Sequence, residues 1–296
     1  MITIVEGDLS HWPAVEAFLP LAADEEDYVI HLWRDWIAHP ENGLTLVALW
    51  ENQPVATTYI AYTDAKSCWF QGIRVDPRFQ GKGIGQELSL ESVRRAKQKG
   101  FSVARCGIDG DNHVSQHVTA KAGFQMIRHY GAYLKQQAWE NREVQGVWEP
   151  ATPDDLDHYV FLQSQAESTQ AVGGFLFTFG FYPPVVTDLL REEATPWEEP
   201  HFLRYVRHGK PLAYVGAFFG DEGELHGKGY LVQGAIIDPE ADANAIWHDL
   251  ERTLRKEEHQ GILVWAHTSD LISPMLLERG YQRLEGQGFQ IWEQKL

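Results

Sequence analysis

The chain has 296 residues, enough for about two domains that each bury a hydrophobic core. Hydrophobic residues make up 44% and charged residues 23% of the sequence, a balance that excludes a disordered or fibrous protein. Lysine and arginine number 25 against 42 aspartate and glutamate, and the net charge of −17 repels a polyanion, so we expect no nucleic-acid partner.

The N-terminal segment and the cysteine content favour a cytoplasmic protein. No basic stretch leads into an apolar run at the start, so we expect no signal peptide. The most apolar stretch, Gly173–Pro184, is short of the roughly 20 residues that a membrane-spanning helix needs, so we expect no membrane partner. Only two cysteines occur, Cys68 and Cys106, and neither they nor the histidines have metal-ligand spacing, so we predict no metal.

The first half of the chain alternates strand patterns with helix patterns. In chain order the residues predict a hairpin, a third strand, a helix, a fourth strand, a second helix that ends near Ala122, and a last strand. The four strands lie at 44–50, 55–62, 68–75 and 102–108, the first helix at 84–99 and the last strand at 130–138. This alternation is typical of an α/β protein with a mixed sheet.

The second half repeats this order. A second hairpin is predicted at 203–206 and 212–219, with Pro211 in the position of Pro54. The segment Ala235–Pro239 corresponds to Ile73–Pro77. A helix at 244–256 and a strand at 262–266 follow, as in the first half. The repeat predicts two homologous domains, residues 1–145 and 146–296.

The clearest local motif is the turn Gln80-Gly81-Lys82-Gly83-Ile84-Gly85, between a strand and a helix. Its glycines leave backbone N–H groups uncovered where the helix dipole adds partial positive charge. Arg74, Arg78 and Lys82 add cationic side chains in an otherwise acidic chain. The turn therefore predicts a pyrophosphate cradle, with a plain strand-to-helix turn as the alternative. The spacing fits neither a Walker loop nor a Rossmann turn.

Together with Asn112, Ser115 and the pair Gly123-Phe124, this turn resembles the GNAT superfamily of N-acetyltransferases, which usually shows [RQ]-x-x-G-x-[GA] and a downstream N-x-x-A. The resemblance covers residues 1 to about 145. The second half resembles the same fold by the order of its elements, but it has Glu240-Ala241-Asp242 where the glycines would stand. The resemblance implies a tandem GNAT chain with an intact N-terminal and a degenerate C-terminal domain.

The resemblance also implies an acetyl-CoA co-substrate that is held mainly by backbone groups. Ile73 and Val75 would line the pantetheine arm, and the Val75 N–H would polarise the thioester carbonyl. Asn112 would contact the pantetheine or the departing thiol. The implied cofactor-binding residues are Ile73, Arg74, Val75, Gln80, Gly81, Lys82, Gly83, Ile84, Gly85, Gln86, Asn112 and Ser115.

The catalytic residues stay unassigned. An acceptor amine must lose its proton, so a general base is expected. Many relatives carry a carboxylate on the strand before the valine, whereas Cys68–Ile73 contains no acid, and Thr119 stands where many relatives have a general-acid tyrosine. The substitutes considered for that tyrosine are Tyr130, Tyr133, His113 and His117, each of which also suits ordinary packing or a surface position.

The resemblance implies acetyl transfer to a primary amine of a small molecule or peptide, by a monomer or a homodimer. The acidic stretch Asp24–Asp27 suits either attraction of a cationic amine or a solvated helix start. The aromatic run Phe175–Tyr182 suits either a substrate pocket or simple packing. The missing carboxylate and tyrosine leave an alternative function, a non-catalytic acyl-CoA sensor or scaffold.

Overall fold

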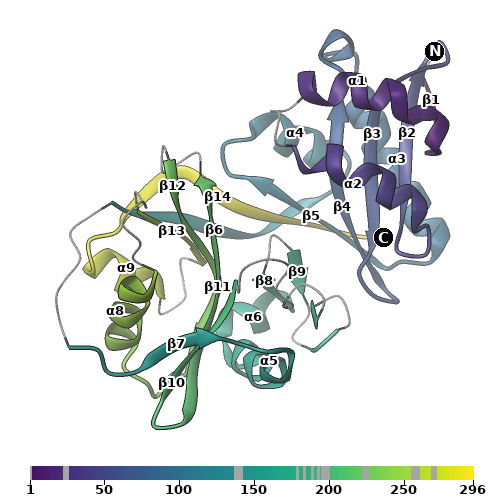
Figure 1. Cartoon of the computed structure of the whole chain (residues 1–296). Helices are drawn as coiled ribbons and strands as arrows, with labels where there is room; N and C mark the ends of the chain where they lie inside the picture. The colour runs from purple at the N-terminus through teal and green to yellow at the C-terminus, as the bar shows by residue number, and fades with distance from the viewer. Residues whose placement is uncertain are drawn as a thin grey trace. The chain divides into compact units, whose positions relative to one another are not determined.

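The computed structural model describes residues 2–22, 27–136, 143–177, 180–182, 185–187, 190–191, 194, 201–222, 227–254, 261–267 and 272–296 (Figure 1). The chain forms two compact units. The first comprises Met1–Ile108, Asn112–Ile127 and Ile291–Leu296, and the second comprises Asp109–Asp111 and Arg128–Gln290. These units are defined by contacts, so the boundary near residue 145, which concerns the sequence repeat, stays a prediction.

The first unit is a mixed sheet with helices on both faces (Figure 1). Strands β1 to β4 pair antiparallel with their neighbours, β4 pairs parallel with β5, and the end of β14 follows β5. Its elements are β1 (Ile2–Glu6), η1 (Leu9–His11), α1 (Trp12–Ala22), α2 (Tyr28–Ala38), β2 (Gly43–Trp50), β3 (Gln53–Tyr62), β4 (Ser67–Val75), η2 (Pro77–Phe79), α3 (Ile84–Lys99), β5 (Val103–Asp109) and α4 (His113–Lys121).

Alternation along β2 separates the two cores of this unit. Leu46 and Ala48 lie in a cluster with the apolar face of α3, whereas Val47 between them lies in a cluster with Trp33 and Trp36 of α2. Successive side chains of a strand point to opposite faces, so a continuous apolar run such as that of β2 indicates a strand covered on both sides. The sheet edges and strand ends are thereby left as the places where a ligand can reach the backbone.

The second unit repeats this arrangement. Its strand order is β14-β6-β13-β12-β11-β10-β7, with β12 and β13 parallel. The described elements are β6 (Gln125–Lys135), β7 (Val147–Pro150), η3 (Pro153–Asp155), α5 (Leu156–Gln165), α6 (Glu167–Val172), β8 (Phe175–Phe177), β9 (Gly180–Tyr182), β10 (Phe202–Arg207), β11 (Lys210–Glu222), β12 (Gly227–Ile237), α8 (Ala243–Thr253), β13 (Ile262–His267), α9 (Ile272–Glu278) and β14 (Gln282–Lys295).

Both hairpins predicted from the sequence have the same turn. Glu51 and Asn52 join β2 to β3 with φ of 49° and 68°, and His208 and Gly209 join β10 to β11 with φ of 51° and 74°. Two successive residues with positive φ form the type I′ turn, whose twist matches that of the paired strands. The repeat inferred from the prolines after these turns therefore extends to backbone conformation.

The strands that follow the two hairpins, β4 and β12, also share backbone features. The N–H of Asp76 donates to the carbonyl oxygen of Val55 at 2.8 Å, and the N–H of Asp238 donates to that of Leu212 at 2.8 Å. A register shift with a glycine of positive φ interrupts each strand before this point, with φ of 65° in β4 and 62° in β12. The two units are copies of one mixed α/β fold.

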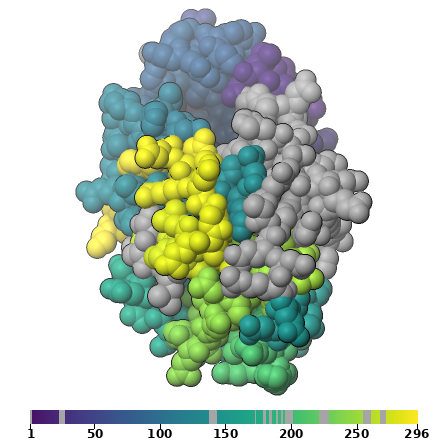
Figure 2. Space-filling model, turned by 90° about the vertical axis from the view of Figure 1, so that its left-hand side faces the viewer, coloured from purple at the N-terminus to yellow at the C-terminus, as the bar shows by residue number. Residues whose placement is uncertain are grey.

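Two segments of the chain belong to other units than the sequence predicts. Residues 128–135 of β6, which overlap the strand expected at 130–138 as the last of the first half, belong to the second unit, and residues 130–135 pair with β13. The last residues of the chain, Ile291–Leu296, belong to the first unit, next to β5. The C-terminal part of the chain, yellow in Figure 2, reaches the surface on the face shown there.

No helix among the described residues is long and apolar enough to cross a membrane. Residues 175–177 and 180–182 of the aromatic run form the small sheet of β8 and β9, and the described side chains there are buried in the second unit. Among the residues described there, packing is therefore the role that the structure supports.

Candidate functional site

The carboxyl end of β4 runs on beyond its pairing with β5. The parallel register joins Ser67–Phe70 to Val103–Cys106 and stops there, while β4 continues to Val75. Gly72, at the register shift with β3, has φ of 65°. A bulge of this kind bends a strand and changes the direction of its edge. The two parallel strands thus diverge, and one edge of β4 is left without a β5 partner.

Backbone groups of Ile73 and Val75 face that edge. The N–H of Asp76 points to β3, where it donates to Val55, and successive N–H groups of a strand alternate between its two edges. The Val75 N–H, and by the same alternation that of Ile73, therefore points toward the side of β5. An extended ligand could accept hydrogen bonds from these N–H groups, as the resemblance implied for a pantetheine arm, whereas the carbonyl oxygens of Ile73 and Val75 already accept from Arg74 Nη1 and Gln80 Nε2.

The glycine turn lies between this edge and α3. Gly81 and Gly83 have φ of 74° and 79°, and a Cβ added to either would have no atom within 4 Å. Gly83 is the N-cap of α3 and supplies no side-chain hydrogen bond to the helix N-terminus. The first N–H groups of a helix need partners, so this N-terminus is open to an anion.

In the second unit, atoms of the protein itself occupy the positions that correspond to the glycine turn and to the edge of β4. Asp242 caps α8, and its carboxylate accepts a hydrogen bond from the Ala245 N–H at 3.1 Å. The carbonyl oxygen of Gly234, the bulge glycine of β12, accepts hydrogen bonds from Tyr159 Oη at 3.0 Å and Gln163 Nε2 at 3.1 Å. The cavity beside it measures only about 20 Å³. This cavity is too small for a pantetheine arm, and a carboxylate occupies the helix N-terminus.

Two of the three cations predicted around the turn have carboxylate partners. Arg78 forms a bidentate pair with Asp76, and this hydrogen bonding lowers the pKa of the buried Asp76 carboxyl. Arg74 forms a bidentate pair with Asp27, with Nε–Oδ2 and Nη2–Oδ1 distances of 2.8 and 2.7 Å. Both pairs reduce the positive charge available to a phosphate.

Lys82 differs from these two arginines. Its ammonium nitrogen lies 4.9 Å from the Trp50 ring centroid and 4.7 Å from that of Phe79. Such cation–π contacts orient the ammonium group without neutralising its charge. Among the predicted cations, Lys82 is therefore the one whose charge is available at the glycine turn.

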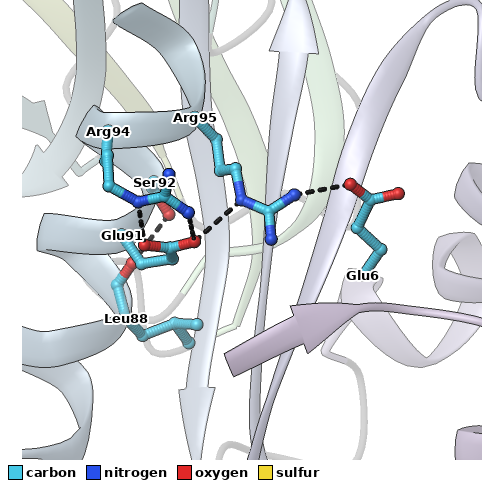
Figure 3. A network of polar contacts seen from close by, with 6 residues as sticks. All are labelled: Glu6, Leu88, Glu91, Ser92, Arg94 and Arg95. Carbon is cyan, nitrogen blue, oxygen red and sulfur yellow. Dashed lines mark hydrogen bonds and ion pairs between the residues drawn. The ribbon is translucent and has the colours of Figure 1, made fainter. Parts of the chain in front are cut away.

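A surface groove of about 470 Å³ borders the turn on the side of β1, lined by Ile2, Ile4, Lys82, Gly83, Glu87 and Glu91. Figure 3 shows how Glu91 is held: its carboxylate accepts hydrogen bonds from Arg94 and Arg95, and Arg95 also reaches Glu6. The bonds from Arg94 are the main reason that the pKa of Glu91 falls to about 2. Glu91 therefore stays ionised on this wall of the groove, and the two arginines balance its charge.

The predicted residues after β5 lie at the start of α4. The Asn112 side chain is the N-cap of that helix, and its Oδ1 accepts a hydrogen bond from the Ser115 N–H at 3.0 Å. His113 and His117 are exposed on the same helix. Oδ1 thus serves the helix with one of its two lone pairs, and the second lone pair and Nδ2 remain for the expected contact with a ligand.

The other candidates for catalysis have structural partners. Tyr130 and Tyr133 belong to the second unit, where Tyr130 Oη accepts a hydrogen bond from the Leu176 N–H and Tyr133 is buried in the core. Burial raises the pKa of the Cys68 and Cys106 thiols to about 12, so neither is a nucleophile at neutral pH. The general base and general acid remain unassigned.

Sequence reasoning missed the pairing of Arg74 with Asp27. In the sequence Asp27 is one of four acidic residues in a run, and the other three, Asp24–Glu26, lie outside the described residues. Its side chain is only 2% exposed, and Oδ1 accepts a hydrogen bond from the Val29 N–H at the start of α2. A buried carboxylate 47 residues from its partner leaves no local signal in the sequence.

Comparison with known proteins assigns the first half of the chain. The model of the acetyltransferase (GNAT) family matches residues 8–124, the stretch that contains the diverging strands and the glycine turn. Residues 8–124 are a GNAT acetyltransferase domain. The chain is also similar to the L-amino acid N-acyltransferase MnaT of Escherichia coli, with 30% identity over 115 residues, which is 33% of this chain and 66% of that protein.

Solved structures match the fold of the whole chain. A tandem GNAT protein from the clavulanic acid biosynthesis pathway is 12% identical, covering 100% of this chain and 98% of that one with a TM-score of 0.64. A GCN5-related N-acetyltransferase from Anabaena variabilis is 11% identical, covering 98% of this chain and 72% of that one with a TM-score of 0.65. The expected tandem arrangement of GNAT-like domains is confirmed at the level of fold.

GNAT proteins use acyl-CoA, and the match of residues 8–124 to this family supports an acyltransferase. The described residues include no group of three or more histidine, cysteine or acidic side chains placed to hold a metal ion.

Proposed function

We propose that this protein is an N-acetyltransferase that moves an acetyl group from acetyl-CoA to a primary amine of a small molecule or peptide. The observation that carries the proposal is the open N-terminus of α3 beside the unpaired edge of β4, within the GNAT domain. The nitrogen of the neutral amine attacks the thioester carbon, the C–N bond forms as the C–S bond breaks, and CoA leaves as a thiolate that takes up the proton lost by nitrogen.

In this proposal each part of acetyl-CoA has its own partner. The amides of Gly81, Gly83 and Gln86 bind the pyrophosphate, helped by the Lys82 ammonium. The pantetheine arm follows Ile73 and Val75, and the Val75 N–H stabilises the oxyanion that forms at the thioester carbonyl. Asn112 and Ser115 border the thiol end. Backbone donors suit this role because they are held rigid by the strand and the helix.

We expect the chain to bind one acetyl-CoA, because the second unit fills both places that would hold another. Titration calorimetry of the whole chain with acetyl-CoA should give a stoichiometry near one. Two equivalent sites per chain would contradict the assignment of the second unit as degenerate, since they would require Asp242 to leave the N-terminus of α8.

Turnover is tested by the release of free thiol from acetyl-CoA in the presence of single amines. The panel should contain amino acids, polyamines, aminoglycosides and peptides, with amino acids first because the similar protein MnaT is an L-amino acid N-acyltransferase. Thiol release that depends on one class of amine supports the transferase.

The second candidate function is a non-catalytic acyl-CoA sensor or scaffold. The observation that favours it is the absence of any carboxylate on β4 and the presence of Thr119 at the usual tyrosine position. Tight acetyl-CoA binding without thiol release on any amine of the panel would select the sensor over the enzyme.

A further inference from the structure

The guanidinium of Arg74 has hydrogen-bonding capacity that its protein partners do not use. Arginine carries five N–H donors. Nε and Nη2 each give one to Asp27, and Nη1 gives one to the Ile73 carbonyl oxygen at 2.9 Å. One N–H on Nη1 and one on Nη2 are left over. The Arg74 side chain is 23% exposed, so part of it is accessible from solvent.

The surroundings hold this side chain in one place. Asp27 is the N-cap of α2, and its buried carboxylate fixes one side of the guanidinium. The ring of Tyr28, which is 43% exposed, lies 5.7 Å from the guanidinium carbon. An arginine held by a carboxylate and an aromatic ring loses little further freedom when it binds a second carboxylate.

The position of Arg74 relates this group to the proposed chemistry. Its backbone lies between Ile73 and Val75, the residues whose N–H groups face the unpaired edge of β4. Their side chains pack with the core cluster that includes α3, whereas the Arg74 side chain turns to α2 on the other face of the sheet. A ligand on Arg74 therefore adjoins the thioester end of the site without occupying the pyrophosphate turn.

We propose that Arg74 binds the carboxylate of the acceptor, so that the acceptors are compounds in which an amine and a carboxylate lie close together, as in α-amino acids. This inference rests on the proposed function and deepens it. The planar fork of two N–H groups can form two parallel hydrogen bonds with a carboxylate. An ammonium group does not offer this geometry.

The test compares acceptors that differ only in the carboxylate: L-leucine with 3-methylbutylamine, and L-phenylalanine with 2-phenylethylamine. KM and kcat are measured at saturating acetyl-CoA for wild type and for Arg74→Gln. We expect the variant to raise KM for the amino acids at least about tenfold and to leave KM for the amines within about twofold. Arg74→Lys should lie between, because it keeps the charge but not the fork. Each acceptor is compared between variants, since the amines differ in basicity.

Asp27→Asn separates binding from a merely structural role. It breaks the charged pair but leaves the arginine, so it should keep the preference for the acids. The double variant Asp27→Asn/Arg74→Gln leaves no buried unpaired carboxylate, and it should lose that preference while still unfolding cooperatively. Equal changes for acids and amines in Arg74→Gln, or the same profile in Asp27→Asn, would overturn the proposal. Arg95→Gln, which also breaks ion pairs in this unit, is the matched control and should leave the preference unchanged.

Titration of the CoA-bound protein with L-leucine and L-phenylalanine tests the same contact without turnover. Binding by wild type that weakens at least about tenfold in Arg74→Gln supports the proposal. The proposal fails if neither amino acid binds to wild type, or if the variant binds as tightly. If the acids bind through Arg74 but no amine releases thiol, the proposed enzyme function fails and the carboxylate site stands.

Discussion

Gly83→Glu should weaken acetyl-CoA binding at least about 100-fold, because it removes the open anion site and replaces it with a carboxylate. Charge-assisted hydrogen bonds contribute about 1.5–3 kcal/mol each, so losing two of them is enough for this effect. A side chain at Gly83 meets no neighbouring atom but must adopt φ of 79°, a conformation that costs about 1 kcal/mol or more outside glycine. Titration calorimetry with acetyl-CoA measures the loss directly.

Gly209→Glu is the matched control. Gly209 has φ of 74°, also has open space around its Cα, and lies in a hairpin of the second unit. It should carry the same backbone strain and the same added charge while acetyl-CoA affinity stays within about twofold. If Gly83→Glu bound acetyl-CoA as tightly as Gly209→Glu does, the glycine turn would not be the pyrophosphate site.

Deletion of Ile291–Leu296 should destabilise the first unit, although these residues are the last of the chain. Trp292 and Leu296 pack against its core, Glu293 pairs with Arg105 at 2.8 Å, and the Leu296 N–H donates to Ser102. Loss of a tryptophan contact and a strand edge should cost at least about 3 kcal/mol. That corresponds to a fall in Tm of roughly 6–12 °C for a unit of this size. Calorimetric unfolding with and without acetyl-CoA shows which unit is affected.

Lys295→Ala is the control for this deletion, since Lys295 is exposed on the same strand and its removal should shift Tm by no more than about 1–2 °C. A deleted chain that kept both its unfolding temperature and its acetyl-CoA affinity would show that the first unit does not need residues 291–296. The expected outcome ties the stability of the first unit to the last strand of the second half.

Much of the local structure could be predicted from the sequence. Pro54 and Pro211 marked matching hairpins, and the helix expected at 84–99 is α3, with Gly83 before it and Gly100 after it in the left-handed region. The degenerate turn at Glu240–Asp242 also corresponds to a helix whose N-terminus is filled by its own carboxylate. These features depend on residues within a few positions of one another, where glycine, proline and capping side chains limit the backbone directly.

The sequence by itself therefore determined the strand and helix order, the repeat and the open glycine turn. Only the tertiary structure decided that β6 joins the second unit, that residues 291–296 complete the first, and that Arg74 pairs with Asp27. Each of these involves residues far apart along the chain, and strand edges accept many partners through the same backbone hydrogen bonds. The choice among those partners is made by the packing of whole units, which no short stretch of sequence records.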